Sequence, residues 1–141
     1  MSLHVQTVGE IYEAFGKGDI PAILDLLDDN VAWESWKRRS AIEAGVPWYQ
    51  ARNGKDGAAR FFEEVGKLQV TDIQIHGMMS NETSVAVDFE FAATYPATGR
   101  SYRDEEIHLW TFGNNGKVLR FRHYIDTAMQ IWVAGKQWPA T

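Results

Sequence analysis

The sequence of 141 residues contains no cysteine. Disulfides, thiolate nucleophiles and cysteine-ligated metal centres are therefore excluded, and the chain fits a reducing compartment. It also lacks an apolar run long enough to cross a bilayer, and its first residues show no basic start followed by an apolar stretch. These absences predict a cytoplasmic protein that does not enter the membrane.

Positive charge is scarce as well, since 14 Lys and Arg stand against 19 Asp and Glu and give a net charge of −5. Nucleic acid binding needs a basic stripe, and the short run Lys37-Arg38-Arg39 does not supply one. What the chain does have is 45% hydrophobic and 13% aromatic residues, enough for a sizeable core. We therefore expect residues 1–141 to form a single domain that does not bind nucleic acid.

Helical patterns occupy the first half of the chain. Apolar residues recur at helical spacing from Val5 to Phe15, and Asp19 looks like the N-cap of a second helix that buries residues as far as Leu27. An extended piece is expected at 31–36, and a third helix opens at Asp56. Between them, residues 37–55 predict a long loop or broken helix of the kind that often covers a site.

Strand patterns follow at 70–76, 83–95, 102–112 and 117–127. In the second of these, Val85, Val87 and Phe89 alternate with polar or small residues, which is typical of a sheet with two unequal faces. Helices first and an antiparallel sheet afterwards predict an α+β domain.

The last two strands form a hairpin with its turn at residues 113–116, because asparagine and glycine tolerate the positive φ of tight turns. We expect Trp110 opposite Leu119, His108 opposite Phe121 and Glu106 opposite His123; a one-residue slip would mix polar and apolar residues on both faces. The preferred register gives one face with an aromatic floor that turns polar at one end, the shape of a pocket mouth. That face contains Glu106, His108, Trp110, Phe112, Leu119, Phe121, His123 and Ile125.

Three segments together resemble the SnoaL-like branch of the NTF2-like superfamily: YEAFGKGDIPAILDLLDDNVAWES, GKDGAARFFEEVG and EIHLWTFGNNGKVLRFRHYID. The resemblance covers nearly the whole chain. It implies a cone-shaped, cystatin-like α+β fold in which a curved antiparallel sheet wraps around N-terminal helices and encloses a cavity. It also implies a homodimer that uses no cofactor. Members include ketosteroid isomerase, limonene epoxide hydrolase and small polyketide cyclases.

Two of these chemistries do not carry over to the matching positions. Ile11, His108 and Ser35 occupy the places of the tyrosine, the protonated aspartic acid and the base of ketosteroid isomerase. Tyr12 is one residue away from the tyrosine position, which rotates a helical side chain by roughly 100°. The arginine that limonene epoxide hydrolase needs near Asp88 is missing.

The polyketide cyclases give the best partial match. His108 matches their histidine, and His123 stands where they have an acid and base aspartate. A histidine can move protons near neutral pH. Our hypothesis is that His123 takes a proton next to a carbonyl while His108 donates a hydrogen bond to the developing enolate, with Glu34 as a secondary acid or base. The expected substrate-binding residues are Trp33, Trp36, Trp110, Phe121, Ile125 and Glu106.

The sequence thus predicts a SnoaL-like protein that binds a small apolar or aromatic ligand and acts as a cofactor-independent isomerase or cyclase, a lyase, on a carbonyl compound. The alternative is a non-catalytic ligand-binding or dimerisation module in which His108 and His123 are structural. Glu106, His108 and His123 also match a metal site of two histidines and one carboxylate. Such a site is unusual for the resembled family, so no metal is expected.

Overall fold

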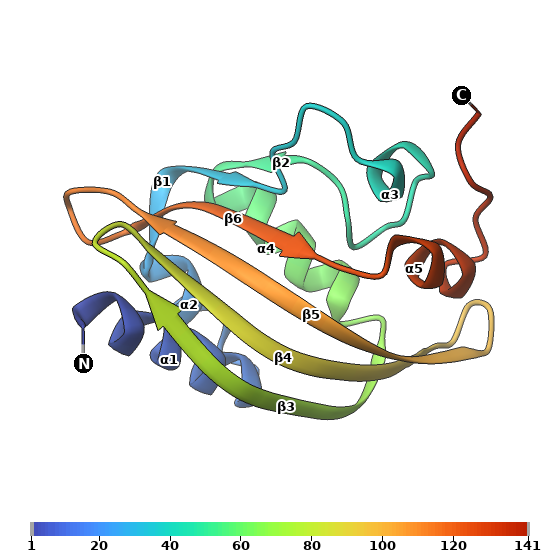
Figure 1. Ribbon diagram of the computed structural model, residues 1–141, viewed down its shortest axis with the longest axis horizontal. Coiled ribbons are helices and arrows are strands. Elements are labelled where there is room, and N and C mark those ends of the chain that lie inside the picture. Colours follow the sequence, from blue (N-terminus) through green and yellow to red (C-terminus); the bar gives the residue numbers. More distant parts are fainter. Residues whose placement is uncertain (1, 141) are drawn as a thin grey trace.

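The computed structural model describes residues 2–140. Six strands form one curved sheet, and helices α1, α2 and α4 pack along its concave face (Figure 1). The elements in chain order are α1 (Leu3–Gly16), α2 (Ile20–Asp25), β1 (Leu27–Trp33), α3 (Ser40–Glu43), β2 (Arg52–Asn53), α4 (Gly54–Val65), β3 (Gln69–Ser80), β4 (Ser84–Tyr95), β5 (Arg100–Phe112), β6 (Val118–Tyr124) and α5 (Thr127–Val133).

The N-terminal helices begin where the capping residues predict. The side chain of Asp19 accepts a hydrogen bond from the backbone of Ala22 at 3.2 Å and starts α2. This helix is shorter than expected, because it ends at Asp25. Leu27, predicted in the helix, instead begins β1, where its side chain is buried. The extended piece expected at 31–36 therefore starts and ends earlier.

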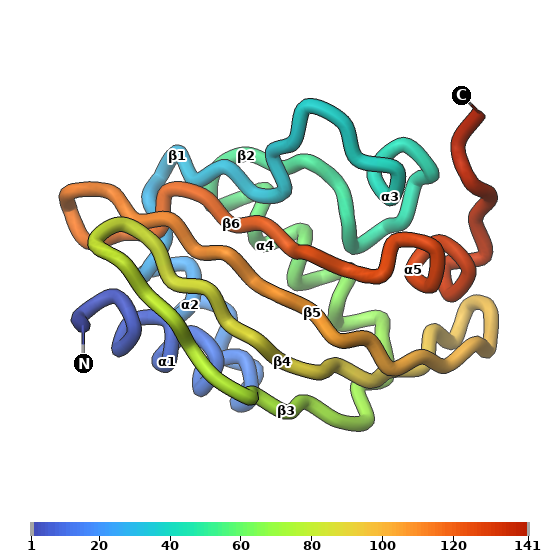
Figure 2. The backbone as a smooth tube through the Cα atoms, in the orientation of Figure 1, coloured from blue at the N-terminus to red at the C-terminus, as the bar shows by residue number. Residues whose placement is uncertain are grey.

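The sheet has the order β2-β1-β6-β5-β4-β3. Its pairs are antiparallel as expected, except that β1 runs parallel to β6, with Trp33 beside Phe121. This parallel pair brings the end of β1 next to the middle of the last strand, and Figure 2 shows the two segments running side by side. The end of β1 and the centre of β6 therefore contribute side chains to the same place.

The hairpin between β5 and β6 has a different register from the predicted one. Trp110 lies opposite Phe121 and His108 opposite His123, whereas we expected Leu119 and Phe121 as their partners. Gly116, at φ 76°, closes a three-residue loop that shifts the pairing by one residue. A bulge after the turn adds a second shift of one.

The two shifts cancel in their effect on the faces. A shift of one residue exchanges the faces of a strand, so a total of two restores them. His108 and His123 consequently stay on the concave face. Leu119 is the exception, because it is the extra residue of the bulge and is exposed, while its neighbour Val118 is fully buried.

Two C-terminal and loop features were not predicted. β6 ends at Tyr124 instead of continuing to 127, and Asp126 caps the short helix α5 by accepting from the backbone of Met129 at 3.1 Å. The loop at 37–55 contains α3 and β2. Among residues 2–140, no helix has the length and apolar character required to cross a membrane.

Candidate functional site

A cavity lies between the concave face of the sheet and the helices α1 and α4. Its walls are mostly aromatic, and side chains with a polar group also reach it: Tyr12, Tyr49, Tyr102, Glu106, His108 and His123. The interior space open to water is about 70 Å³, which holds a handful of water molecules. A mostly apolar pocket with a few converging polar groups is the usual form of a small-molecule site.

His123 is held in one orientation by a buried carboxylate. Its Nδ1 lies 2.9 Å from Oε1 of Glu34, and the same oxygen accepts the backbone N–H of His123. Glu34 is fully buried, and its other oxygen accepts from Nε1 of Trp36 at 3.0 Å. A carboxylate can only accept, so Nδ1 of neutral His123 carries the proton and Nε2 keeps its lone pair.

Glu34 reaches His123 because of an uncommon backbone conformation. It follows the last residue of β1 and has φ 56°, the one positive φ found at a residue other than glycine between residues 2 and 140. Such a conformation costs free energy at a residue with a Cβ and persists where the surroundings enforce it. Here the enforced turn directs the carboxylate behind β6, where Nδ1 of His123 lies.

His108 is held from the opposite side of the cavity by α1. Its Nδ1 lies 2.6 Å from the hydroxyl of Tyr12, which also accepts from Nε1 of Trp110 at 3.1 Å. Because an indole only donates, the Tyr12 oxygen accepts from Trp110 and its own O–H is free to donate to Nδ1. When the Tyr12 hydroxyl donates to Nδ1 in this way, the proton of neutral His108 is on Nε2.

Burial keeps these groups uncharged. The ring of His108 lies 4.1 Å from that of Phe89 and 4.9 Å from that of Phe121, measured between centroids. Burial, and then the neighbouring His123, lower the pKa of His108 well below its usual value. Burial also raises the pKa of Tyr12, so its hydroxyl keeps its proton. Tyr12 and His108 are therefore both neutral at pH 7.

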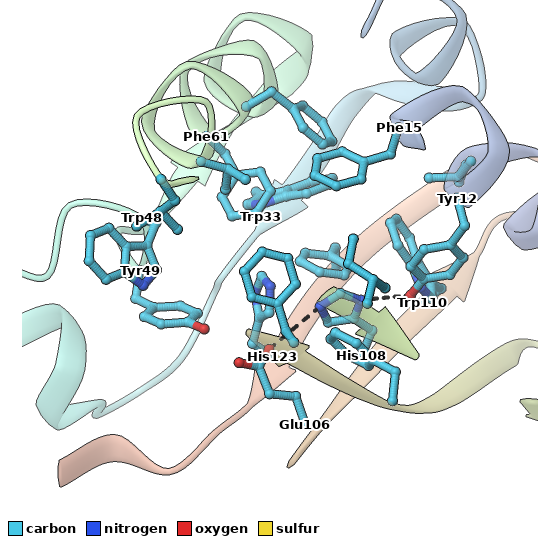
Figure 3. Close-up of a pocket in the computed structure, with 18 of the residues that line it drawn as sticks. Tyr12, Phe15, Trp33, Trp48, Tyr49, Phe61, Glu106, His108, Trp110 and His123 are labelled. Carbon is cyan, nitrogen blue, oxygen red and sulfur yellow. Dashed lines mark hydrogen bonds and ion pairs between the residues drawn. The ribbon is translucent and has the colours of Figure 1, made fainter. Parts of the chain in front are cut away.

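Glu106 completes the polar end of the cavity. Its Oε1 lies 4.0 Å from Nε2 of His108, and its Oε2 lies 3.4 Å from the side-chain amide of Gln130. Burial is the main cause of its raised pKa, followed by the charge of Asp104. Burial thus favours the protonated form of Glu106, whose carboxyl group faces the two histidines (Figure 3).

Most of the predicted site residues meet in this cavity. His108, His123, Glu106, Trp33, Trp110 and Phe121 all line it. Glu34 lies behind His123 and does not line the cavity.

Two residues that we predicted to bind substrate do not line the cavity, so the prediction was wrong for them. Trp36 packs against Tyr124 and between the guanidinium groups of Arg39 and Arg122. β1 ends at Trp33, and Trp36 lies three residues further on, so that strand alternation would also place it on the opposite face from Trp33. Ile125, which follows the end of β6, packs against the core without lining the cavity.

The sequence interpretation missed the three tyrosines that line the cavity, Tyr12, Tyr49 and Tyr102. Tyr12 had been set aside because one helical step rotates a side chain, yet both Ile11 and Tyr12 line the cavity, which is wide enough to receive neighbouring positions of α1. Its place in the apolar stripe of the first helix was a usable signal. Tyr49, whose ring meets that of His123 edge-on at 4.9 Å, comes from the irregular segment at 37–55 and gave none.

Comparison with known proteins identifies the family. The model of the SnoaL-like domain matches residues 8–121, so the chain belongs to the SnoaL-like domain family. No curated protein sequence matches it significantly.

Solved structures of the NTF2-like fold are similar over most of the chain. An NTF2-like protein of unknown function from Burkholderia pseudomallei K96243 is 26% identical, with TM-score 0.78, covering 95% of this chain and 98% of that one. TerC, co-crystallised with polyporic acid, is 19% identical, with TM-score 0.74 and coverages of 95% and 99%. Delta 5-3-ketosteroid isomerase from Mycobacterium sp. is 17% identical, with TM-score 0.67 and coverages of 88% and 93%. At this identity, the last two likenesses show the fold alone.

Proposed function

We propose that this protein is a cofactor-independent isomerase or cyclase that transfers a proton on a small, apolar, cyclic or aromatic carbonyl compound. The observation that carries the proposal is that Nδ1 of each histidine is bonded to a side chain behind it, which leaves both Nε2 atoms at the polar end of the cavity. Glu34 leaves a lone pair on Nε2 of His123, and Tyr12 leaves a proton on Nε2 of His108. One histidine is thereby prepared to accept a proton and the other to donate a hydrogen bond.

The proposed step uses both Nε2 atoms. The carbonyl oxygen of the substrate accepts the N–H of His108, and Nε2 of His123 removes a proton from the adjacent carbon. The resulting negative charge resides on the enolate oxygen, where the N–H of His108 stabilises it. The imidazolium of His123 faces the carboxylate of Glu34, as in other histidine–carboxylate pairs, and then returns the proton to carbon or oxygen.

The position of the histidines supports this assignment over a purely structural role. Their rings are 4.4 Å apart, centroid to centroid, and both line the cavity. Each Nδ1 is used internally, but within residues 2–140 neither Nε2 has a hydrogen-bond partner. The atoms needed for chemistry are thus the ones left free.

Exchange of carbon-bound hydrogen tests the proposal directly. NMR would follow deuterium uptake from D2O next to the carbonyl of small probes such as cyclohexanone and 1-indanone. We expect acceleration by the wild-type protein and a loss of 10² to 10⁴-fold, on the order of a removed general base, in His123→Ala. Glu34→Gln should lose at least about tenfold, because the imidazolium loses its carboxylate.

A matched control is the exposed His76 on the other face of the sheet, whose replacement by alanine should leave exchange unchanged. Circular dichroism would confirm folding of each variant. Ketones that bind without any accelerated exchange would reject the enzyme in favour of the second candidate, a non-catalytic ligand-binding module. That candidate is supported by the predominantly aromatic wall of the cavity.

We further propose that the protein is a homodimer. The outward-facing Met79 of β3 and Tyr124 of β6 are 58% and 41% exposed, and packing of the outer faces of two sheets against each other would cover both side chains. Light scattering coupled to size exclusion should give twice the chain mass. A monomer at micromolar concentration would reject this.

A further inference from the structure

We propose that Glu106, His108 and His123 form a binding site for a divalent transition-metal ion, for which Zn²⁺ is the appropriate probe. Their ligand atoms all lie within 4.8 Å of one another, and no other group of three such residues within residues 2–140 meets that criterion. Two imidazoles and one carboxylate suit Zn²⁺ and its neighbours, whereas Mg²⁺ and Ca²⁺ prefer oxygen ligands. The site goes beyond the proposed function and does not depend on it.

Both imidazoles are held by their far nitrogen, as metal-binding histidines usually are. Nδ1 of His123 is bonded to the carboxylate of Glu34, and Nδ1 of His108 to the hydroxyl of Tyr12. Each Nε2 is thereby directed toward the cavity. A hydrogen bond from Nδ1–H to a carboxylate also makes Nε2 a stronger ligand, so Glu34 would act as a positioning residue behind the site.

The ligand set must contract only a little to hold an ion. In tetrahedral coordination with bonds of about 2.0–2.2 Å, ligand atoms lie about 3.3 Å apart. Oε1 of Glu106 and Nε2 of His108 are 4.0 Å apart, and rotation about the side-chain bonds of Glu106 can close this difference. The fourth position faces the aromatic cavity, which is where a water or a ligand atom would bind.

Charge and protons also balance. A divalent ion would be neutralised by the carboxylates of Glu34 and Glu106 together. Glu106 binds the ion as a carboxylate, and any proton that it carries passes to solvent. On His108 the proton moves from Nε2 to Nδ1, where it is donated to the oxygen of Tyr12, and the Tyr12 hydroxyl turns toward the cavity. Binding therefore strengthens as the pH rises, because each ligand atom must be free of its proton.

Calorimetric titration of the metal-free protein with Zn²⁺, in buffers of different ionisation enthalpy, tests the proposal. We expect one Zn²⁺ per chain, and any proton displaced from the ligands makes the measured heat depend on the buffer. Co²⁺ should bind competitively and give the visible absorption of a four-coordinate site. Glu106→Gln, which keeps the size of the side chain, should weaken Zn²⁺ binding at least tenfold, and Glu34→Gln by about 10 to 100-fold.

His76→Ala is the matched control, because His76 pairs with Glu90 on the outer face. Binding lost in this variant, or kept in Glu106→Gln, would place the metal at the surface and overturn the proposal, as would the absence of stoichiometric binding to the wild type. Because the ion uses the same two Nε2 atoms as the carbonyl substrate, Zn²⁺ should also suppress proton exchange. The titration is read without substrate, so its failure is distinguishable from failure of the proposed function.

Discussion

Two histidine–glutamate pairs lie on opposite faces of the same sheet. On the concave face, Nδ1 of His123 is 2.9 Å from Glu34, and the two side chains are 6% and 0% exposed. On the outer face, Nε2 of His76 is 3.1 Å from Glu90, and the side chains are 43% and 21% exposed. The contacts are nearly equal in length, but the surroundings are not.

The difference shows that burial, more than contact distance, decides whether the geometry of a histidine–glutamate pair is fixed. Glu90 also accepts from Arg103, which bonds Asp72 in turn, so the outer pair is part of a solvated network. Water screens these charges and can replace any partner. Glu34 and His123 have no such replacement, and their geometry is therefore fixed.

The strongest test of this contrast is removal of each glutamate. Glu34→Ala should lower the free energy of unfolding by about 3–5 kcal/mol, because it leaves the buried Nδ1–H and backbone N–H of His123 without an acceptor. Glu90→Ala should show at most a slight loss, because its partners are solvated. Urea unfolding measures both, and equal losses would show that burial does not separate the pairs.

The hairpin turn gives the next largest effect, since its register places His123 on the concave face. Gly116 has φ 76°, a conformation that costs a residue with a Cβ about 1–2 kcal/mol. Gly116→Ala should lose about that much in a denaturant titration. Gly9→Ala, in the middle of α1 with open space around its Cα, should instead gain roughly 0.5–1 kcal/mol. A neutral Gly116→Ala would contradict a cost for the positive φ at this turn position.

The pH dependence of the free energy of unfolding should also distinguish the buried groups of the concave face from the exposed groups of the outer face, by a smaller amount. The pKa of Glu106 is raised by burial, so its contribution to stability is complete below its unfolded pKa and is lost as the pH rises through the folded one. Glu106→Gln should flatten this alkaline loss in thermal unfolding followed over pH. The lowered pKa of His108 has the opposite sign: its contribution is present above pH 6.5 or so and is lost on acidification. An unchanged profile in Glu106→Gln would mean that Glu106 is ionised in the folded protein.

The smallest effect is expected from Arg103→Ala. Arg103 lowers the pKa values of Asp72 and Glu90, so its contribution is present above their unfolded pKa values and fades as the pH falls through the folded ones. All three side chains are solvated, and we expect only a slight loss of thermal stability that disappears in high salt. A loss comparable to that of Glu34→Ala would contradict the comparison.

Much of the fold was predictable from local patterns. The apolar stripe of α1, the Asp19 cap of α2 and the alternation of β4 identify elements that the structure confirms. α5 escaped prediction because its seven residues are too few for a clear period, although Asp126 is a recognisable cap. The parallel pairing of β1 with β6 left no local signal, since it joins strands far apart in the sequence.

The site was predictable in part, because alternation along a strand is also a local pattern. Alternation along β5 and β6 placed Glu106, His108 and His123 on one face, and this survived a wrong register because the error was two residues. Trp36 is three residues from Trp33, an odd spacing that alternation assigns to opposite faces, and Ile125 lies beyond the end of the regular strand β6. There, periodicity no longer predicts direction.

The sequence by itself determined the fold class, the family resemblance and the facing of the two histidines, because these depend on the order of elements and on periods within single strands. Only the tertiary structure decided the tautomers. They are set by Tyr12, 96 residues from His108 in the chain, and by Glu34, 89 residues from His123. A histidine becomes a base or a donor according to the atom at its other nitrogen, and that neighbour is supplied by a different element of the fold.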